Sequence, residues 1–309
     1  MKKVLITGGS GTLGRAIIKR TFRENWEWDI TIYSRDTFKQ AIVRSMFPEI
    51  KCIVGDVCDY QSIHNAMAGM DLCIHAAATK VIPDSEVYPI ATTEVNVNGS
   101  YNVLAAAMNL NIPQVIGIST DKACHPANLY GASKYTMEKF FVKYSQMGLR
   151  TKFHLVRYGN VLESTGSVVA AWRKADAEGR AIYMTDPDMT RFWISPRQAV
   201  GFIMEALQLN SGEVYIPKMK ATTIEQLAKY VLSDVDNVQR VEMRPGEKKH
   251  ETLLTLEEGD FATEYNDHFV LRPTTSWRNT SAGKVAIDPY TSEFAPRMTK
   301  QELLDLLDE

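Results

Sequence analysis

The chain contains 309 residues, of which 45% are hydrophobic and 23% charged, and its formal net charge is -2. This composition is typical of globular enzymes, and it provides no basic surface that would favour nucleic acid or an anionic membrane as a partner. Because no apolar run approaches the roughly 20 residues that a membrane-spanning helix requires, we expect neither nucleic acid nor a membrane as a partner.

The first half of the chain alternates short apolar runs with amphipathic segments, a pattern typical of repeated βαβ units. The expected strands are 3–7, 30–34, 52–55, 72–76, 115–119 and 152–157. Expected helices between them include 13–24, 62–68, 93–110 and 130–144. Strands and helices in this order predict the α/β class with a doubly wound parallel sheet, the Rossmann arrangement with right-handed crossovers.

A glycine-rich turn, reading GGSGTLG from Gly8 to Gly14, follows the first strand and leads into the first helix. It satisfies the G-x-G-x-x-G spacing of dinucleotide-binding turns. Glycine lets the backbone approach a pyrophosphate closely, and the helix N-terminus offers N–H groups to its oxygens. The alternative is an ordinary glycine turn. We expect a dinucleotide to contact Gly8, Ser10, Gly11, Thr12, Leu13 and Gly14.

The second strand ends in Ser34 and Arg35, where an NAD-preferring site usually carries a carboxylate for the ribose 2′-OH. A hydroxyl and a guanidinium suit a 2′-phosphate instead, because Arg can bind it bidentately. Asp36 comes one position late, so we expect it to point away, and we assign Lys39 to the cofactor site as well. The segment therefore predicts NADP, with a solvated charge cluster as the alternative.

Tyr130 and Lys134 are spaced i, i+4 at the start of an expected helix, which places both side chains on one face. A tyrosine is a poor base at neutral pH because its pKa lies near 10. A nearby ammonium group, together with a positive nicotinamide, would lower that pKa. The segment Ser119-Thr120-Asp121-Lys122 follows the fifth strand just before the pair, and this context favours a catalytic function.

The glycine turn, Asn96 and the Tyr130/Lys134 pair resemble the extended short-chain dehydrogenases/reductases. More narrowly, the chain resembles the inverting UDP-N-acetylglucosamine 4,6-dehydratases of surface-polysaccharide and pseudaminic acid biosynthesis. The most specific resemblance lies in Thr120-Asp121-Lys122 and in Met189-Thr190-Arg191-Phe192-Trp193-Ile194. Further matching runs are Gly55-Asp56-Val57, His75-Ala76-Ala77-Ala78, Arg157-Tyr158-Gly159-Asn160-Val161 and Arg244-Pro245-Gly246-Glu247-Lys248.

This resemblance implies a redox-neutral dehydration of a UDP-sugar with NADP. Tyr130 would take the proton from the 4-OH while NADP accepts the C4 hydride and later returns it to C6, and Thr120 would hydrogen-bond the sugar oxygen. Lys122 would remove the C5 proton and Asp121 would protonate the departing 6-OH, while Lys134 would hold the nicotinamide ribose. Lys122 can act as a base only if its pKa falls, which burial and nearby cations would favour. A loop lysine that binds phosphate is the alternative for Lys122.

The resemblance also implies further contacts. The adenine would meet Asp56 and Val57, Ala77 would line the nicotinamide channel, and Lys80 would reach both cofactor and substrate. The implied substrate contacts are Lys80, Asn160, Val161, Thr185 and Arg244. Departures from the family pattern leave the sugar and the nucleotide open: Glu163-Ser164-Thr165-Gly166 replaces a Gly-Ser-Arg-Gly turn, Val81 replaces a histidine, Cys124-His125 replaces two small or amide residues, and the C-terminal lobe is short.

After Asn160 the segments become irregular and contain prolines. We expect residues 1–159 to form the NADP-binding domain and 160–309 a smaller C-terminal substrate-binding lobe. Within that lobe, 195–212 is expected to return to the main sheet as a helix. Residues 300–307 are expected to form a last amphipathic helix. Arg191 and Trp193 fit either packing between the lobes or binding.

The four cysteines lack metal-type pairing, and the six histidines lack ligand spacing, so we expect no metal site. We interpret the cysteines as reduced, which favours a cytoplasmic protein, and the resemblance implies a homo-oligomer. An NADP-dependent nucleotide-sugar epimerase or reductase is the first alternative to the dehydratase, because it needs Tyr130 and Lys134 but no Asp-Lys pair. A non-catalytic dinucleotide sensor is the second, but such proteins commonly lose the Tyr or the Lys.

Overall fold

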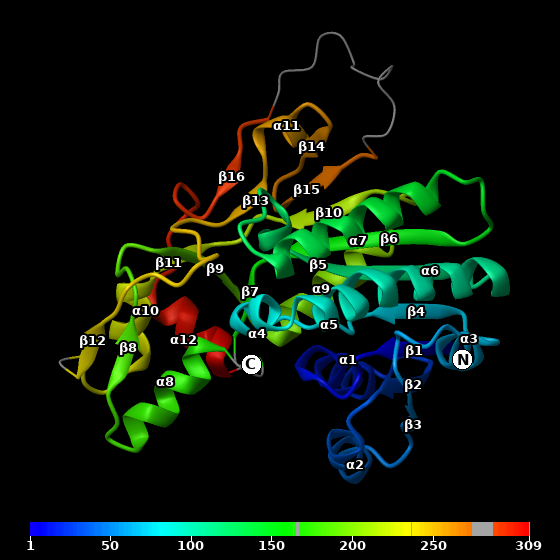
Figure 1. Ribbon diagram of the computed structural model, residues 1–309, viewed down its shortest axis with the longest axis horizontal. Coiled ribbons are helices and arrows are strands. Elements are labelled where there is room, and N and C mark those ends of the chain that lie inside the picture. Colours follow the sequence, from blue (N-terminus) through cyan, green and yellow to red (C-terminus); the bar gives the residue numbers. More distant parts are fainter. Residues whose placement is uncertain (163, 165–166, 236, 274–286, 309) are drawn as a thin grey trace.

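The computed structural model describes residues 1–162, 164, 167–235, 237–273 and 287–308 (Figure 1). Its main sheet has the strand order β14-β15-β10-β6-β5-β4-β1-β2-β3. The strands from β1 to β6 are parallel to their neighbours, and β15 is antiparallel to both β10 and β14. The prediction of a doubly wound parallel sheet is therefore confirmed.

All six strands expected from the sequence form, with ends that differ from the prediction by at most two residues. They are β1 (Lys2–Thr7), β2 (Trp28–Ser34), β3 (Lys51–Val54), β4 (Leu72–His75), β5 (Gln114–Thr120) and β6 (Lys152–Tyr158). The central strands are buried almost along their whole length because helices cover both faces of a parallel sheet.

The helices pack in two sets. In one set α6 (Gly99–Leu110) contacts both α3 (Tyr60–Met67) and α7 (Leu129–Ser145), and in the other α1 (Thr12–Arg23) contacts α9 (Pro196–Ala206). The remaining helical segments of this half are α2 (Thr37–Met46), α4 (Ile82–Val87), α5 (Pro89–Thr93), the π-helical turn η1 (Glu94–Asn98) and the 3-10 turn η2 (Asp121–Ala123). The expected helix 93–110 is therefore divided at η1.

The chain after residue 160 builds a second, smaller core. Its buried residues include Leu162, Trp172, Trp193, Leu227 and Leu303. Its elements are β7 (Asn160–Val161), α8 (Val168–Ala177), β8 (Ile182–Met184), β9 (Thr190–Ile194), β11 (Ala221–Thr223), α10 (Ile224–Val231), β12 (Val238–Arg240) and α12 (Lys300–Asp308). The strands β13 (Thr252–Leu254) and β16 (Tyr290–Thr291) pack instead on the main core through Leu253, Leu254 and Tyr290, and α11 (Leu256–Gly259) follows β13. Figure 1 shows α8, α10, α12, β8 and β12 gathered at one end of the molecule.

The expected lobe boundaries need one correction. Within 160–309 only residues 195–212 were expected to rejoin the main sheet, and α9 does pack into the main core through Ala199, Val200 and Ile203. The structure also places β10 (Val214–Pro217), β14 (Ala262–Glu264) and β15 (His268–Leu271) in the main sheet. These strands are short, and β10 is buried at every position, so it extends the sheet beyond β6.

No helix in the described part of the chain is long and apolar enough to cross a membrane. All four cysteines are free thiols.

Candidate active site

The glycine turn after β1 adopts a conformation that requires glycine. Gly8 has φ +67°, and a Cβ there would lie 2.9 Å from the Ala77 Cα. The Gly11 N–H donates to the Gly8 carbonyl at 2.9 Å, which closes the turn ahead of α1. At Gly14 a Cβ would collide with the Gly9 carbonyl, so this glycine lets the helix pack closely on the turn. The backbone is thereby free to meet a phosphate.

The end of β2 forms the next part of the site. The Ser34 hydroxyl lies 3.0 Å from that of Ser10, and the Gln40 amide donates to the same Ser34 oxygen at 3.0 Å. Asp36 caps α2 by accepting from the Lys39 N–H at 2.9 Å, and it also pairs with the Lys39 ammonium. The Asp36 carboxylate, which we expected to point away from the cofactor, is thus engaged in capping α2. Gln40 was not anticipated.

A buried asparagine joins the loop after β4 to α7. The Asn96 side chain accepts from the Thr79 N–H at 2.8 Å and donates to the Thr79 carbonyl at 2.9 Å. It also donates to the Ser133 hydroxyl at 2.9 Å, between Tyr130 and Lys134 on α7. Asn96 therefore fixes the Ala77–Lys80 segment against the helix that carries the Tyr-Lys pair.

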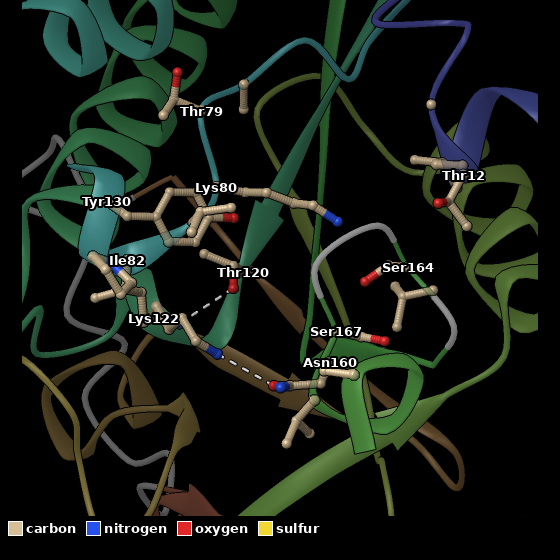
Figure 2. A pocket seen from close by; sticks show the side chains of 18 of the residues that line it. Thr12, Thr79, Lys80, Ile82, Thr120, Lys122, Tyr130, Asn160, Ser164 and Ser167 are labelled. Carbon is tan, nitrogen blue, oxygen red and sulfur yellow. Dashed lines mark hydrogen bonds between the residues drawn. The ribbon is translucent and has the colours of Figure 1, made fainter. Parts of the chain in front are cut away.

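These elements surround one cavity of about 1120 Å³. Its lining includes every predicted site residue except Gly14 and Asp121. Asp121 is fully buried directly behind the lining. In Figure 2, Tyr130, Lys80 and Thr120 face the cavity from one side, and Thr12, Ser164 and Ser167 lie across it. Glu163, Thr165 and Gly166 lie outside the described residues.

The loop after β5 carries a compact group of polar side chains. The Lys122 ammonium lies 3.0 Å from Asp121 Oδ1. It also lies 3.2 Å from Asn160 Oδ1 (Figure 2). The Thr120 hydroxyl donates to Asp121 Oδ1 at 2.9 Å and accepts from the Lys122 N–H. A Cβ at Gly131 would collide with the Lys122 carbonyl, so glycine at the start of α7 lets this loop lie beside Tyr130.

Burial shifts the ionisation of these groups. It raises the pKa of Asp121, against the opposing charge of Lys122, so the carboxyl group tends towards its protonated, acidic form. Burial also lowers the pKa of Lys134 to about 8. The expected fall in the pKa of Lys122 is wrong, whereas the expected fall for Tyr130 assumed a bound nicotinamide and stays a prediction. Burial raises the pKa of Tyr130, although Lys122 acts in the opposite direction. Burial would lower the pKa of Lys122, but the charges of Asp121 and Glu251 outweigh it and the pKa is raised.

Sequence reasoning missed Glu251, whose carboxylate lies 3.4 Å from the Lys122 ammonium. It is flanked by Lys248 at 3.2 Å and by Arg191 at 3.8 Å. The available signal was its position three residues after Lys248, at the end of the quoted Arg244–Lys248 run. Arg191 also donates to the carbonyls of Thr190 and Lys248, so it both packs between segments and faces this cluster.

The Rossmann sheet, the glycine turn and the Tyr-Lys helix define an extended short-chain dehydrogenase/reductase. The chain belongs to the polysaccharide biosynthesis protein family, whose model matches residues 4–273. This confirms the resemblance drawn from the motifs.

The chain is similar to relatives with two different names. The UDP-N-acetylglucosamine 4,6-dehydratase (inverting) of Campylobacter jejuni is 36% identical, over 88% of this chain and 83% of the relative. The UDP-glucose 4-epimerase of Rickettsia massiliae is also 36% identical, over 99% of this chain and 95% of the relative. Among solved structures, Pen from Bacillus thuringiensis has a TM-score of 0.90 at 29% identity, over 99% of this chain and 96% of Pen.

A more distant structure, the dTDP-glucose 4,6-dehydratase DesIV from Streptomyces venezuelae, has a TM-score of 0.72 at 19% identity. It covers 80% of this chain and 86% of DesIV, and it supports the fold.

Proposed function

We propose that this protein is an inverting UDP-N-acetylglucosamine 4,6-dehydratase that forms a 4-keto-6-deoxy UDP-sugar for surface glycan synthesis. The observation that carries the proposal is that Lys122, which lines the cavity together with Tyr130, pairs at 3.0 Å with Asp121 buried behind the lining. Oxidation and reduction at C4 need only a tyrosine and a lysine, whereas elimination of water needs an additional base and acid. The name of the Campylobacter jejuni relative supports the same reaction.

The residues of the cavity fit a nicotinamide dinucleotide. The glycine turn leaves space that a Cβ at Gly8 would disturb, and the cavity continues from it past Ser34 and Arg35 to Lys134. Gly8 and Ser10 to Leu13 would hold the pyrophosphate, Asp56 and Val57 the adenine, Ala77 the nicotinamide, and Lys134 the ribose. When bound, the cofactor accepts a hydride from C4 of the sugar and returns it at C6.

We further propose NADP as the cofactor. Arg35 is exposed, is 3.3 Å from Asp56 and, like Lys39, lines the cavity near Ser34. A guanidinium, an ammonium and a hydroxyl there suit a 2′-phosphate. NADP should therefore bind more tightly than NAD in a fluorescence titration, and Arg35→Ala should weaken NADP binding while leaving NAD binding unchanged. Tighter binding of NAD to the unaltered protein would contradict this assignment.

In the first half of the reaction, the Tyr130 phenolate takes the proton from the sugar 4-OH. The positive charges of Lys134 and of the bound cofactor would counter the burial that raises the pKa of this phenol. Thr120 would donate a hydrogen bond to the reacting oxygen. Lys80, Asn160, Val161, Thr185 and Arg244 line the part of the cavity that would receive the UDP-sugar.

In the second half, the new ketone acidifies the C5 proton. Lys122 as a neutral amine takes that proton and becomes an ammonium, while Asp121 as a neutral acid gives its proton to the departing O6, so water leaves. A proton shift from the Lys122 ammonium to Asp121, across 3.0 Å, would form this neutral pair without a net change in charge, at a cost set by the raised pKa of Lys122. After the hydride has returned to C6, a solvent-derived proton adds to C5 from the opposite face.

A 4-epimerase is the second candidate, because the Rickettsia massiliae relative with that name aligns with 99% of this chain. The decisive experiment incubates the purified protein with UDP-N-acetylglucosamine in D₂O and follows the sugar by NMR. Dehydration predicts a 4-keto-6-deoxy product with deuterium at C5, without net consumption of NADPH. Epimerisation predicts a C4 epimer that retains its C5 proton.

The same assay tests the assigned base. Lys122→Ala should abolish dehydration, whereas Lys249→Ala, a control at an exposed neighbouring lysine, should leave the rate unchanged. Dehydration by Lys122→Ala at nearly the unaltered rate would refute the assignment. Assembly as a homo-oligomer and a cytoplasmic location stay predictions, to be checked by light scattering and by cell fractionation.

A further inference from the structure

Glu251 is a buried carboxylate supplied by the C-terminal part of the chain. It is 2% exposed and directly precedes β13. Its N–H donates to the Ser292 hydroxyl at 2.8 Å, and its carbonyl accepts from the Ser292 N–H at 2.8 Å. Because β13 pairs with β16 next to these bonds, the backbone of Glu251 is fixed from both sides.

The side chain of Glu251 faces three cations. Oε1 lies 3.4 Å from the Lys122 ammonium and 3.8 Å from Arg191 Nε, while Oε2 lies 3.2 Å from the Lys248 ammonium. Lys122 is thereby held between two carboxylates, with Asp121 on one side and Glu251 on the other. Among the described residues, Oδ2 of Asp121 is buried without a hydrogen-bond partner.

We propose that Glu251 is a positioning residue for Lys122: it holds the amine between Asp121 and Asn160 and stabilises the ammonium that forms when Lys122 takes the C5 proton. This inference rests on the proposed dehydratase function, because an epimerase would give Lys122 no proton to take.

Charge explains why a second carboxylate helps. An amine whose ammonium form is stabilised is a stronger base, so removal of the C5 proton becomes more favourable. The same charges hold the resting proton on Lys122, so the neutral amine must first form by a proton shift to Asp121, 3.0 Å away, whose neutral form burial favours. The charged and titratable groups that face Lys122 are Asp121, Glu251, Arg191 and Tyr130.

The cations around Glu251 keep it ionised. Burial would raise its pKa, but Lys122, Arg191 and Lys248 together lower that pKa to about 2. Glu251 is therefore a permanent negative charge at the pH of turnover. A cluster that only supports the fold would share these contacts, so the test must report on Lys122 itself.

The test compares Glu251→Gln, which keeps the shape and removes the charge, with the control Glu257→Gln at an exposed carboxylate on the neighbouring helix α11. Measured quantities are kcat, KM, the pH profile of kcat and C5 deuterium incorporation with UDP-N-acetylglucosamine. We expect Glu251→Gln to lower kcat about 10- to 100-fold, with KM nearly unchanged. The inflections that the Asp121–Lys122 pair produces in the pH profile of kcat should move about one pH unit or more towards acid, because a nearby negative charge is lost.

Single-turnover absorbance should show that oxidation at C4 remains fast in Glu251→Gln while C5 exchange slows. An unchanged pH profile and kcat in a folded variant would overturn the inference and leave the dehydratase proposal standing. A C4 epimer from the unaltered protein would overturn both. Should Glu251→Gln fail to fold in a thermal melt, Glu251→Asp decides: a lower kcat with a smaller acid shift supports the inference, and an unaltered profile and kcat refute it.

Discussion

Replacement of Arg157 by methionine should destabilise the protein strongly, because it removes the cation from a buried ion-pair cluster. The Arg157 side chain is 1% exposed, and those of Glu138 and Glu258 are 5% and 16% exposed. The guanidinium donates to Glu138 at 2.9 and 2.6 Å and to Glu258 at 2.8 Å through two nitrogens. It also donates to the Leu253 carbonyl at 2.9 Å.

The expected cost follows from what Arg157→Met leaves behind. Two buried carboxylates lose their counter-charge, and breaking a buried pair in this way costs about 3–5 kcal/mol. For a chain of 309 residues, an unfolding entropy of about 2.1 cal/mol/K per residue converts this cost into a Tm lowered by about 5–8 °C. The matched control is Arg180→Met, which removes an exposed partner of Glu178 and should cost at most about 1 kcal/mol.

The pH dependence provides a second check. Burial would raise the pKa of Glu258, but the Arg157 charge holds it below the usual range, so this carboxylate stabilises the fold above the ordinary carboxyl pKa. Without Arg157 the pKa of Glu258 should rise, so the Tm deficit of the variant should be largest at neutral pH and shrink near about pH 4. A Tm within one or two degrees of the unaltered protein at neutral pH, or a deficit independent of pH, would refute this reasoning.

Three further outcomes are expected. Tyr130→Phe should lower kcat by about 10²–10⁴-fold with little change in stability, because only the phenol that takes the 4-OH proton is lost; steady-state kinetics with a thermal melt would check this, and a kcat within threefold of normal, on the order of RT in energy, would contradict it. Burial lowers the pKa of His154 to about 4, so stability should be lost as pH falls from about 6.5 towards about 4; His154→Phe should flatten this slope in pH-dependent melts, and parallel slopes would count against it. Gly8→Ala should weaken dinucleotide binding in a fluorescence titration, because its Cβ would lie 2.9 Å from the Ala77 backbone at a positive φ. Unchanged binding would disprove that the turn needs glycine at this position.

Local patterns account for the parts of the fold that sequence reasoning predicted. The strands of the first half are continuous apolar runs bounded by turns, and the glycines from Gly8 to Gly14 have a spacing that only a close backbone approach requires. The strands β10, β14 and β15 were not predicted, because each has only three or four residues. Two of them, β14 and β15, form a short hairpin. Such short runs carry no reliable period, so their place in the main sheet depends on tertiary packing.

The candidate site divides in the same way. Tyr130 and Lys134 share a helix face, so their proximity follows from spacing, and Asp121 and Lys122 are adjacent. The ionisation of Lys122 did not follow, because burial alone predicts a lower pKa and the opposing carboxylate of Glu251 comes from a distant segment. Sequence spacing reveals neighbours along one element, whereas electrostatics depends on every charge that folding brings near.

The pairing of Glu251 with Ser292 has a consequence for biosynthesis. A nascent chain can complete the glycine turn, the Tyr-Lys helix and most of the parallel sheet while its final segments are still inside the ribosome. The lysine beside Asp121 would then lack its second carboxylate. Docking of Ser292 against Glu251 would then complete the proposed acid–base group after the nucleotide pocket has formed.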